Sequence, residues 1–385
     1  MDRDLYSDDH EQFRTVVREF VNREVKPHLE EWNEQRATGR AVWEAAGKQG
    51  VIGLSGPEEY GGAGLMRDYR FRNVVYEELM RAGGASLASG FSLQDDILIP
   101  YVVAMGTEEQ KQRWLPDMCA GRSIMAVAMT EPGTGSDLKG IRTTATEAPG
   151  GWVVNGSKTF ITSGIQCDRV VVVAKTDPSG GTDAFSLLVL EEGMEGFAKG
   201  RKLDKLGLQA QDTSELFFDN VFVPTENLLG TLGGGFRQLM GHLPLERLAI
   251  AAGAVASASA ALDWTLKYTN EREAFGQPLA DFQNSRFTLA DIATEIDVSR
   301  AYLDKCILAF NEEKLSAVDA AKAKLWTTEV QNRVIDRCLQ LHGGYGYMME
   351  FPIAQAYLDA RVQKIYGGTN QIMRQIIGRD LTGRR

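Results

Sequence analysis

The chain has 385 residues, of which 43% are hydrophobic and 24% charged, and its formal net charge is −10 at pH 7. This length and composition are typical of a globular protein of two or three domains with a large core. The acidic balance argues against nucleic acid as the main partner, because nucleic-acid binding relies on basic patches that neutralise phosphates.

The sequence also lacks the marks of a membrane, secreted or metal-binding protein. No apolar run approaches the roughly 18 residues that span a bilayer, and the start, MDRDLYSDDHEQF, has no signal-peptide core. The four cysteines and four histidines are dispersed, without C-x-x-C or H-E-x-x-H spacing. We therefore expect a cytoplasmic protein with reduced thiols, no metal site and no membrane span.

Residues 1–123 are predicted to form a helical domain. Apolar residues at helical spacing predict a helix over 8–25. Thr107 and Gln110 have the spacing of a capping box before a second helix, which should end near Gly121. Between these helices, GPEEYGGAG (56–64) is too rich in glycine for regular structure and predicts a loop.

Residues 124–232 have a different pattern, in which short β-rich runs are separated by turn clusters. The Asn155-Gly156 pair stands between two such runs and is typical of a hairpin turn. No long helical pattern intervenes, so we expect an antiparallel barrel or sandwich.

Residues 233–385 are predicted to be helical again. Pro244 should kink the first of these helices, because proline removes an amide donor and crowds the preceding turn. The expected fold class is α+β, with an N-terminal helical domain (1–123), a middle β domain (124–232) and a C-terminal four-helix bundle (233–385).

Familiar nucleotide and hydrolase motifs are absent. GWVVNGSKT (151–159) is similar to a P-loop, but Ser157 stands where lysine must directly follow glycine. No G-x-G-x-x-G follows a strand and opens a helix, and no G-x-S-x-G elbow occurs. The loop AMTEPGTGSDLKG (128–140) and two Gly-Gly breaks near the C-terminus are better candidates, because glycine lets the main chain approach a ligand closely.

One carboxylate, Glu246, stands out in LPLERLAIAAGA (243–254), at the head of a run of small apolar residues. Such a run suits a helix packed closely against others, where a glutamate is seldom buried without a partner. Two interpretations are open, a salt bridge to a distant basic residue and a catalytic base.

Five segments, in order along the chain, resemble motifs of the acyl-CoA dehydrogenases, a flavoprotein family. They are AMTEPGTGSDLKG (128–140), NGSKTFITSG (155–164), EREAFGQPLADFQ (271–283), QLHGGYGY (340–347) and IYGGTNQIM (365–373). The resemblance covers nearly the whole chain and implies a helix–sheet–helix order, bound FAD and α,β-desaturation of an acyl-CoA thioester. Electrons would pass to an electron-transferring flavoprotein.

The resemblance assigns ligand contacts to matching positions. It places Met129, Thr130 and Ser136 beside the flavin or the coenzyme A arm, and Phe160 and Thr162 on the other side of the isoalloxazine. Phe160 replaces a commoner tryptophan, so an indole donor is lost. The rest of the FAD site is implied at Arg272, Phe275, Gln283, Gln340, Gly344, Thr369 and Gln371. Because some family contacts come from a neighbouring subunit, a homo-oligomer, usually a tetramer, is implied.

The resemblance also bears on the base. In many members the base precedes the second glycine of IY-x-G-T, a position that is Gly367 here. The long-chain and isovaleryl types place a glutamate on the helix that opens the C-terminal domain, which matches Glu246. Arg247 matches a supporting arginine, and Tyr366 and Gly367 would contact the substrate, with the Gly367 N–H directed at the thioester carbonyl.

Other functions are open as well. An acyl-CoA oxidase of the same fold would return electrons to oxygen, a related flavin hydroxylase would not need Glu246, and a non-catalytic helical scaffold would use none of these motifs. The segment FSLQDDILIPYVV (91–103) should line the acyl pocket. We expect its Asp95 and Asp96 to face solvent or cap a helix, because burying an unpaired charge is costly. An inward orientation would favour a functionalised acyl chain.

Overall fold

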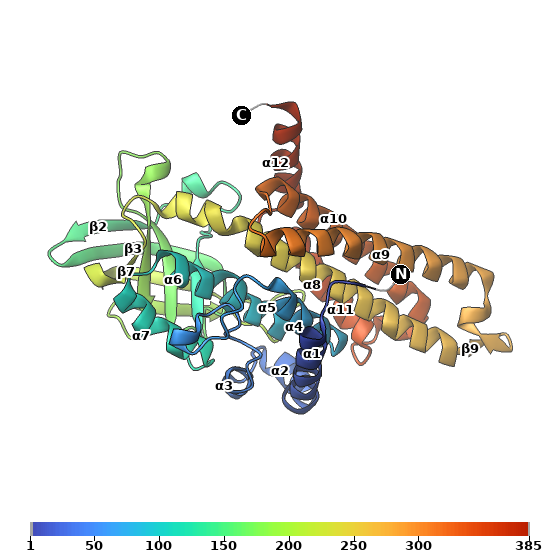
Figure 1. Cartoon of the computed structure of the whole chain (residues 1–385). Coiled ribbons are helices and arrows are strands. Elements are labelled where there is room, and N and C mark those ends of the chain that lie inside the picture. Colours follow the sequence, from blue (N-terminus) through green and yellow to red (C-terminus); the bar gives the residue numbers. More distant parts are fainter. Residues whose placement is uncertain (1–2, 384–385) are drawn as a thin grey trace.

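The computed structural model describes residues 3–383, which form three parts in the expected order of helices, sheet and helices (Figure 1). The N-terminal helices are α1 (Asp8–Phe20), α2 (Leu29–Gln35), α3 (Arg40–Lys48), α4 (Tyr69–Arg81), α5 (Ala85–Ser92), α6 (Ile99–Met105) and α7 (Glu108–Cys119). The capping box before α7 is confirmed, with Gln110 N donating to Thr107 Oγ1 at 3.3 Å and Thr107 N to Gln110 Oε1 at 3.0 Å.

The middle part is a mostly antiparallel sheet with the strand order β6-β7-β3-β2-β4-β5-β8. Contrary to the prediction, β1 pairs with β4 in parallel. The strands are β1 (Met125–Ala128), β2 (Thr144–Ala148), β3 (Gly151–Thr162), β4 (Arg169–Lys175), β5 (Phe185–Glu191), β6 (Phe197–Lys202), β7 (Thr213–Pro224) and β8 (Leu228–Leu229).

The hairpin predicted at Asn155-Gly156 is wrong, because both residues lie inside β3. That strand stays paired with β7 on either side of them, and its register shifts between Val154 and Gly156. A Cβ on Gly156 would lie only 2.6 Å from Thr143 Oγ1, so the glycine is needed where the strands approach closely. The turn signal marks a β-bulge, and the chain reverses before Gly151 instead.

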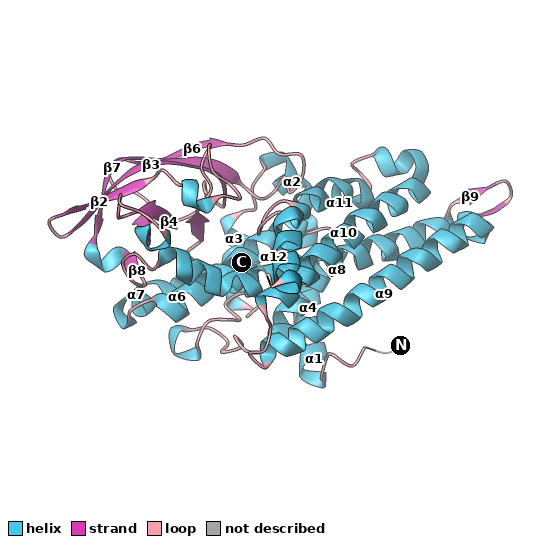
Figure 2. Cartoon of the chain, turned by 90° about the horizontal axis from the view of Figure 1, so that it is seen from above, coloured by secondary structure: helices cyan, strands magenta, loops and turns pink. Residues whose placement is uncertain are grey.

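The C-terminal part packs α8 (Gly235–Glu271), α9 (Gln283–Asn311), α10 (Ala317–His342), α11 (Pro352–Ala360) and α12 (Asn370–Thr382). A short ribbon of β9 (Glu273–Ala274) and β10 (Gln277–Pro278) joins α8 to α9 (Figure 2). Helix α8 continues through Pro244 as one element. Contrary to expectation, it is long and apolar enough to cross a membrane, but 83% of its most apolar stretch is buried within the protein.

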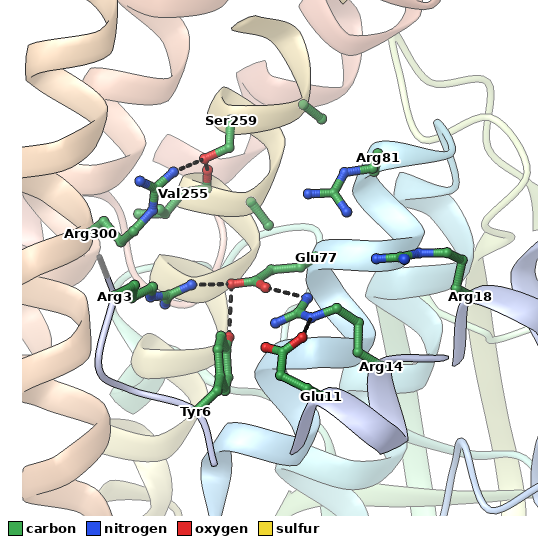
Figure 3. A pocket seen from close by; sticks show the side chains of 12 residues that line it. Arg3, Tyr6, Glu11, Arg14, Arg18, Glu77, Arg81, Val255, Ser259 and Arg300 are labelled. Atoms are coloured by element: carbon green, nitrogen blue, oxygen red, sulfur yellow. Dashed lines mark hydrogen bonds and ion pairs between the residues drawn. The ribbon is translucent and has the colours of Figure 1, made fainter. Parts of the chain in front are cut away.

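The N-terminal and C-terminal helices meet at a cleft lined by α1, α4, α8 and α9, which Figure 3 shows from close by. Five arginines line this cleft, but acidic groups neutralise them. Arg3 pairs with Glu77 and Asp304, and Arg14 pairs with the other oxygen of Glu77. Arg18 and Arg81 both pair with Glu78, which is buried. The cleft is therefore an ion-pair seam between the two helical parts.

Replacing Glu77 with Gln should destabilise this seam by about 2 kcal/mol, because hydrogen bonds to charged groups contribute ~1.5–3 kcal/mol each. Burial alone would raise the pKa of Glu77, but the charges of Arg3 and Arg14 hold that pKa below its ordinary value. The stabilisation is therefore present above the pKa of the unfolded chain and is lost as pH falls toward the lowered folded-state pKa. Urea unfolding at pH 7 and at lower pH measures both effects.

The matched control is Glu313→Gln, which removes an exposed pairing with Arg67. Exposed pairs contribute ~0–1 kcal/mol. Equal losses in the two variants at pH 7 would contradict the role given to Glu77.

Candidate active site

A cavity of about 130 Å³ lies where the three parts of the chain meet. Ser92 and Ile97 line it from the N-terminal helices, Thr162 from the end of β3, and Glu246 from α8. Tyr366 and Gly367 line it from the turn before α12. Segment 91–103, which was expected to line the acyl pocket, contributes Ser92, Leu93 and Ile97 to this cavity.

Glu246 is the carboxylate that lines this cavity, and it is only 7% exposed. Tyr101 donates a hydrogen bond to Glu246 Oε1 at 2.6 Å. Among residues 3–383, no basic side chain forms a salt bridge with Glu246. Burial raises the pKa of Glu246, although the Tyr101 hydrogen bond and the charge of Arg247 oppose that rise. The arrangement fits a carboxylate that accepts a proton better than one that serves as an ion-pair anchor.

Arg247 lies buried behind the turn that carries Gly367. Its Nη2 would lie 4.0 Å from a Cβ on Gly368, and its Nε has no hydrogen-bond partner. Lys324, on α10, donates to Gly368 O and to Asn370 Oδ1, each at 2.9 Å. Burial and the neighbouring charge of Arg247 lower the pKa of Lys324 to about 7. Lys324 therefore holds the back of the turn by two hydrogen bonds, with Arg247 beside it, and the sequence pattern did not single out Lys324.

A side chain at position 367 would strain the turn and displace the end of the Ile250 side chain. Gly367 has a φ of +62°, which favours glycine, and a Cβ there would overlap Ile250 Cδ1. Ile250 follows Glu246 by one helical turn on α8 and also lines the cavity. The space that a side chain at position 367 would need is thus filled by Ile250, while Glu246 supplies the carboxylate.

Of the residues implied for FAD, Thr162 lines this cavity, and several others belong to the segments next to it. Met129 and Thr130 follow β1, and Thr159 N donates to Thr130 O at 2.9 Å, which joins them to the end of β3. Phe160 leaves its ring 67% exposed at a φ of +59°. An open aromatic face beside half-buried polar groups fits a flat ring system such as flavin. Thr369 and Gln371 begin α12 near the same turn, and Ser136 is exposed in the loop after β1.

The other implied FAD residues are not brought to this cavity. Arg272, Phe275, Gln283, Gln340 and Gly344 are all exposed and lie around the far end of α8, near the β9 ribbon (Figure 2). At 1.5 Å per residue, the stretch of α8 from Glu246 to Arg272 is about 39 Å long. The two groups of implied FAD residues therefore lie toward opposite ends of this stretch, and a single FAD would have to span it to reach both.

The expectation for Asp95 and Asp96 is wrong, since both are buried rather than facing solvent. Asp95 accepts hydrogen bonds from Gly53 N at 2.9 Å and Ser55 N at 3.0 Å. Asp96 pairs with Arg72 at 3.1 Å and accepts a hydrogen bond from Ser92 at 2.9 Å. Burial raises the pKa of Asp95 to about 6. Protein groups satisfy both carboxylates, so neither is left free for a substrate.

Comparison with known proteins agrees with the resemblance seen in the sequence. Models of the N-terminal, middle and C-terminal domains of acyl-CoA dehydrogenase match residues 7–122, 126–221 and 233–382. The chain is 46% identical to the mitochondrial long-chain specific acyl-CoA dehydrogenase of Mus musculus, covering 98% of this chain and 88% of the relative. It is 38% identical to the mitochondrial isovaleryl-CoA dehydrogenase of Solanum tuberosum, covering 98% and 91%.

Solved structures match over the whole fold. An acyl-CoA dehydrogenase from Geobacillus kaustophilus has a TM-score of 0.95 at 44% identity and covers 99% of this chain and 100% of its own. A structure that carries the name electron transferring flavoprotein of Acidaminococcus fermentans scores 0.94 at 36% identity, with 99% of both chains covered. A glutaryl-CoA dehydrogenase from Mycobacterium smegmatis in complex with FADH2 scores 0.92 at 29%, covering 99% and 96%. The chain therefore belongs to the acyl-CoA dehydrogenase family and is an FAD-dependent oxidoreductase that acts on an acyl-CoA thioester.

Proposed function

We propose that Glu246 is the base that removes the α-proton of the acyl-CoA substrate. The observation that carries this proposal is a buried carboxylate with no salt bridge among the described residues, lining the cavity beside Thr162 and Gly367. A proton next to a thioester is weakly acidic, so the base must lie close to it and the developing enolate must be stabilised. FAD, when bound, supplies the acceptor for the β-hydride.

Gly367 and its neighbours are proposed to hold the thioester. A glycine in the left-handed conformation lets the backbone approach a ligand closely, so the Gly367 N–H is suited to donate to the carbonyl oxygen. Buried Arg247 adds positive charge behind the same turn. Ala249 and Gly253 are small residues that line the cavity along α8, and they leave room for a straight acyl chain.

The distance between the two groups of residues implied for FAD supports an oligomer. We assign Met129, Thr130, Phe160, Thr162, Thr369 and Gln371 to the FAD of their own chain. The exposed group that includes Arg272 and Phe275 lies toward the other end of α8, and Phe275 is 97% exposed. These residues are therefore proposed to contact the FAD of a second subunit, in a dimer or a tetramer.

Electrons are proposed to leave through an electron-transferring flavoprotein. The similarity to the Acidaminococcus fermentans structure, which is named for such a flavoprotein, supports this route. The alternative, an oxidase, would carry out the same dehydrogenation and return electrons to oxygen. Oxygen consumption during turnover distinguishes the two, since a dehydrogenase should reduce an added flavoprotein acceptor much faster than oxygen.

The proposed function is tested by mixing the purified yellow protein anaerobically with straight-chain acyl-CoAs of increasing length and with isovaleryl-CoA. We expect the flavin absorbance to bleach, fastest with the longer straight chains, and the enoyl-CoA product to form in equal amount. A protein that stays yellow with every one of these thioesters would be a non-catalytic scaffold.

A further inference from the structure

The nearest polar neighbour of the proposed base comes from a different part of the chain. Tyr101 lies on α6 in the N-terminal part, is fully buried, and donates its hydroxyl hydrogen to Glu246 Oε1 at 2.6 Å. Its ring packs against His242, one helical turn before Glu246, with ring centroids 5.0 Å apart. Burial of Tyr101 and the contact of its ring with His242 therefore fix the position of the hydroxyl relative to α8.

This contact divides the roles of the two carboxylate oxygens. Oε1 is occupied by Tyr101, whereas Oε2 has no hydrogen-bond partner among the described residues and is not one of the fully enclosed unpaired atoms. Because Glu246 lines the cavity, Oε2 is the oxygen that remains open to it. A glutamate has three rotatable side-chain bonds, and a catalytic base must be held within about 0.5 Å of its productive position.

Titratable groups from several elements surround the carboxylate of Glu246. Their protonation states decide whether Tyr101 acts as a hydrogen-bond donor to it. The titratable groups are Tyr101 on α6, His242 and Arg247 on α8, Tyr76 on α4, Tyr366 in the turn, and Lys324 behind Arg247. Burial lowers the pKa of His242, so the imidazole stays neutral at pH 7. Burial and the nearby Glu246 raise the pKa of Tyr101 well above its ordinary range, so its hydroxyl remains a donor.

We infer that Tyr101 is a positioning residue for proton abstraction, whose hydroxyl holds Oε1 of Glu246 so that Oε2 faces the α-carbon of the substrate. The inference rests on the proposed role of Glu246. It also links the N-terminal and C-terminal helical parts at the reacting atoms, because the base and the residue that orients it lie on different parts.

Tyr101→Phe tests this inference, since it removes one hydroxyl and keeps the ring. The hydrogen bond stabilises the ionised carboxylate, so its loss should raise the pKa of Glu246. We expect flavin reduction to slow by about tenfold at pH 7, which is what the loss of one hydrogen bond to a charged group predicts. The pH at which reduction is half-maximal should move upward by about one unit, while the acyl-CoA dissociation constant changes less than about twofold.

The matched control is Tyr60→Phe, which also removes a tyrosine–carboxylate hydrogen bond, in this case to Glu108 and away from the cavity. It should leave the rate and the pH profile of flavin reduction unchanged. Thermal unfolding and flavin content of both variants show whether either loses structure. An unchanged rate and pH profile in Tyr101→Phe would overturn the inference.

A double variant separates positioning from damage to the pocket. In a Glu246→Gln background there is no carboxylate to orient, so adding Tyr101→Phe should cause no further loss. A loss as large as in the wild-type background would show a structural effect and overturn the inference. If Glu246→Gln itself reduced its flavin normally, the proposed role of Glu246 as the base would be wrong. An inactive Glu246→Gln together with a normal Tyr101→Phe would refute only the inference about Tyr101.

Discussion

Replacing Glu246 with Gln is expected to abolish most flavin reduction while acyl-CoA still binds. The amide keeps the size and shape of the side chain and can still accept a hydrogen bond from Tyr101, but it cannot accept the α-proton. General-base catalysis contributes roughly 10²- to 10⁴-fold, so the rate should fall by at least that much. Stopped-flow absorbance of the flavin under anaerobic conditions measures the rate, and titration with an enoyl-CoA measures binding.

The matched control is Asp359→Asn, a buried carboxylate on α11 that does not line the cavity and accepts a hydrogen bond from Leu208 N. A loss of activity confined to Glu246→Gln locates the base. If Glu246→Gln reduces its flavin at the wild-type rate, Glu246 is a structural charge and the base lies elsewhere.

The base can also be moved to position 367 as a stricter check. Gly367→Glu alone should strain the turn, because the φ of +62° is unfavourable for glutamate and a Cβ there would have to displace Ile250 Cδ1. We therefore expect partial recovery of the Glu246→Gln rate only when Gly367→Glu is combined with Ile250→Ala. Full recovery is not expected, since the new side chain lacks Tyr101 as a partner.

Arg272→Ala is expected to weaken FAD binding by about 10- to 100-fold and to loosen the oligomer at the same time. A charge-assisted hydrogen bond to a phosphate contributes ~1.5–3 kcal/mol. Arg272 is exposed on the isolated chain and lies about 39 Å along α8 from Glu246, so we propose that it contacts a phosphate of the FAD of a second subunit. Flavin content after gel filtration and the mass of the eluting species report both effects in one experiment.

Arg67→Ala serves as its control, because it also removes an exposed arginine, one that pairs with Glu313. That variant should remain yellow with an unchanged mass. An Arg272→Ala protein that keeps its flavin and its mass would show that Arg272 does not contact FAD across a subunit boundary.

The sequence was sufficient to predict the order of the three parts, because the spacing of apolar residues and the residues that favour turns are local features. It failed where a local signal has a second structural meaning. Asn155-Gly156 is a good turn pair, yet β3 continues through it because the β7 partners on both sides hold the strand. Only the pairing of β3 with β7, which the two residues do not encode, shows that the glycine serves a bulge.

The sequence also failed to predict that two charged side chains are buried, and the cause is again non-local. Asp95 and Asp96 are tolerated inside because Ser55 and Arg72 supply donors from about 20 to 40 positions earlier in the chain. Glu246 could be found because a carboxylate among small apolar residues is itself unusual. Tyr101 and Ile250 gave no signal, since a tyrosine and an isoleucine in apolar helices are typical of a core.

Exchange of the substrate's α-protons for deuterium isolates proton abstraction by Glu246 from every later step. An acyl-CoA analogue with sulfur in place of the β-carbon can lose an α-proton but cannot give up a β-hydride. Incubated with wild-type protein in D2O, it should lose its α-proton NMR signal, and with Glu246→Gln the signal should persist at least 100-fold longer. Equal exchange in the two proteins would show that Glu246 is not the base.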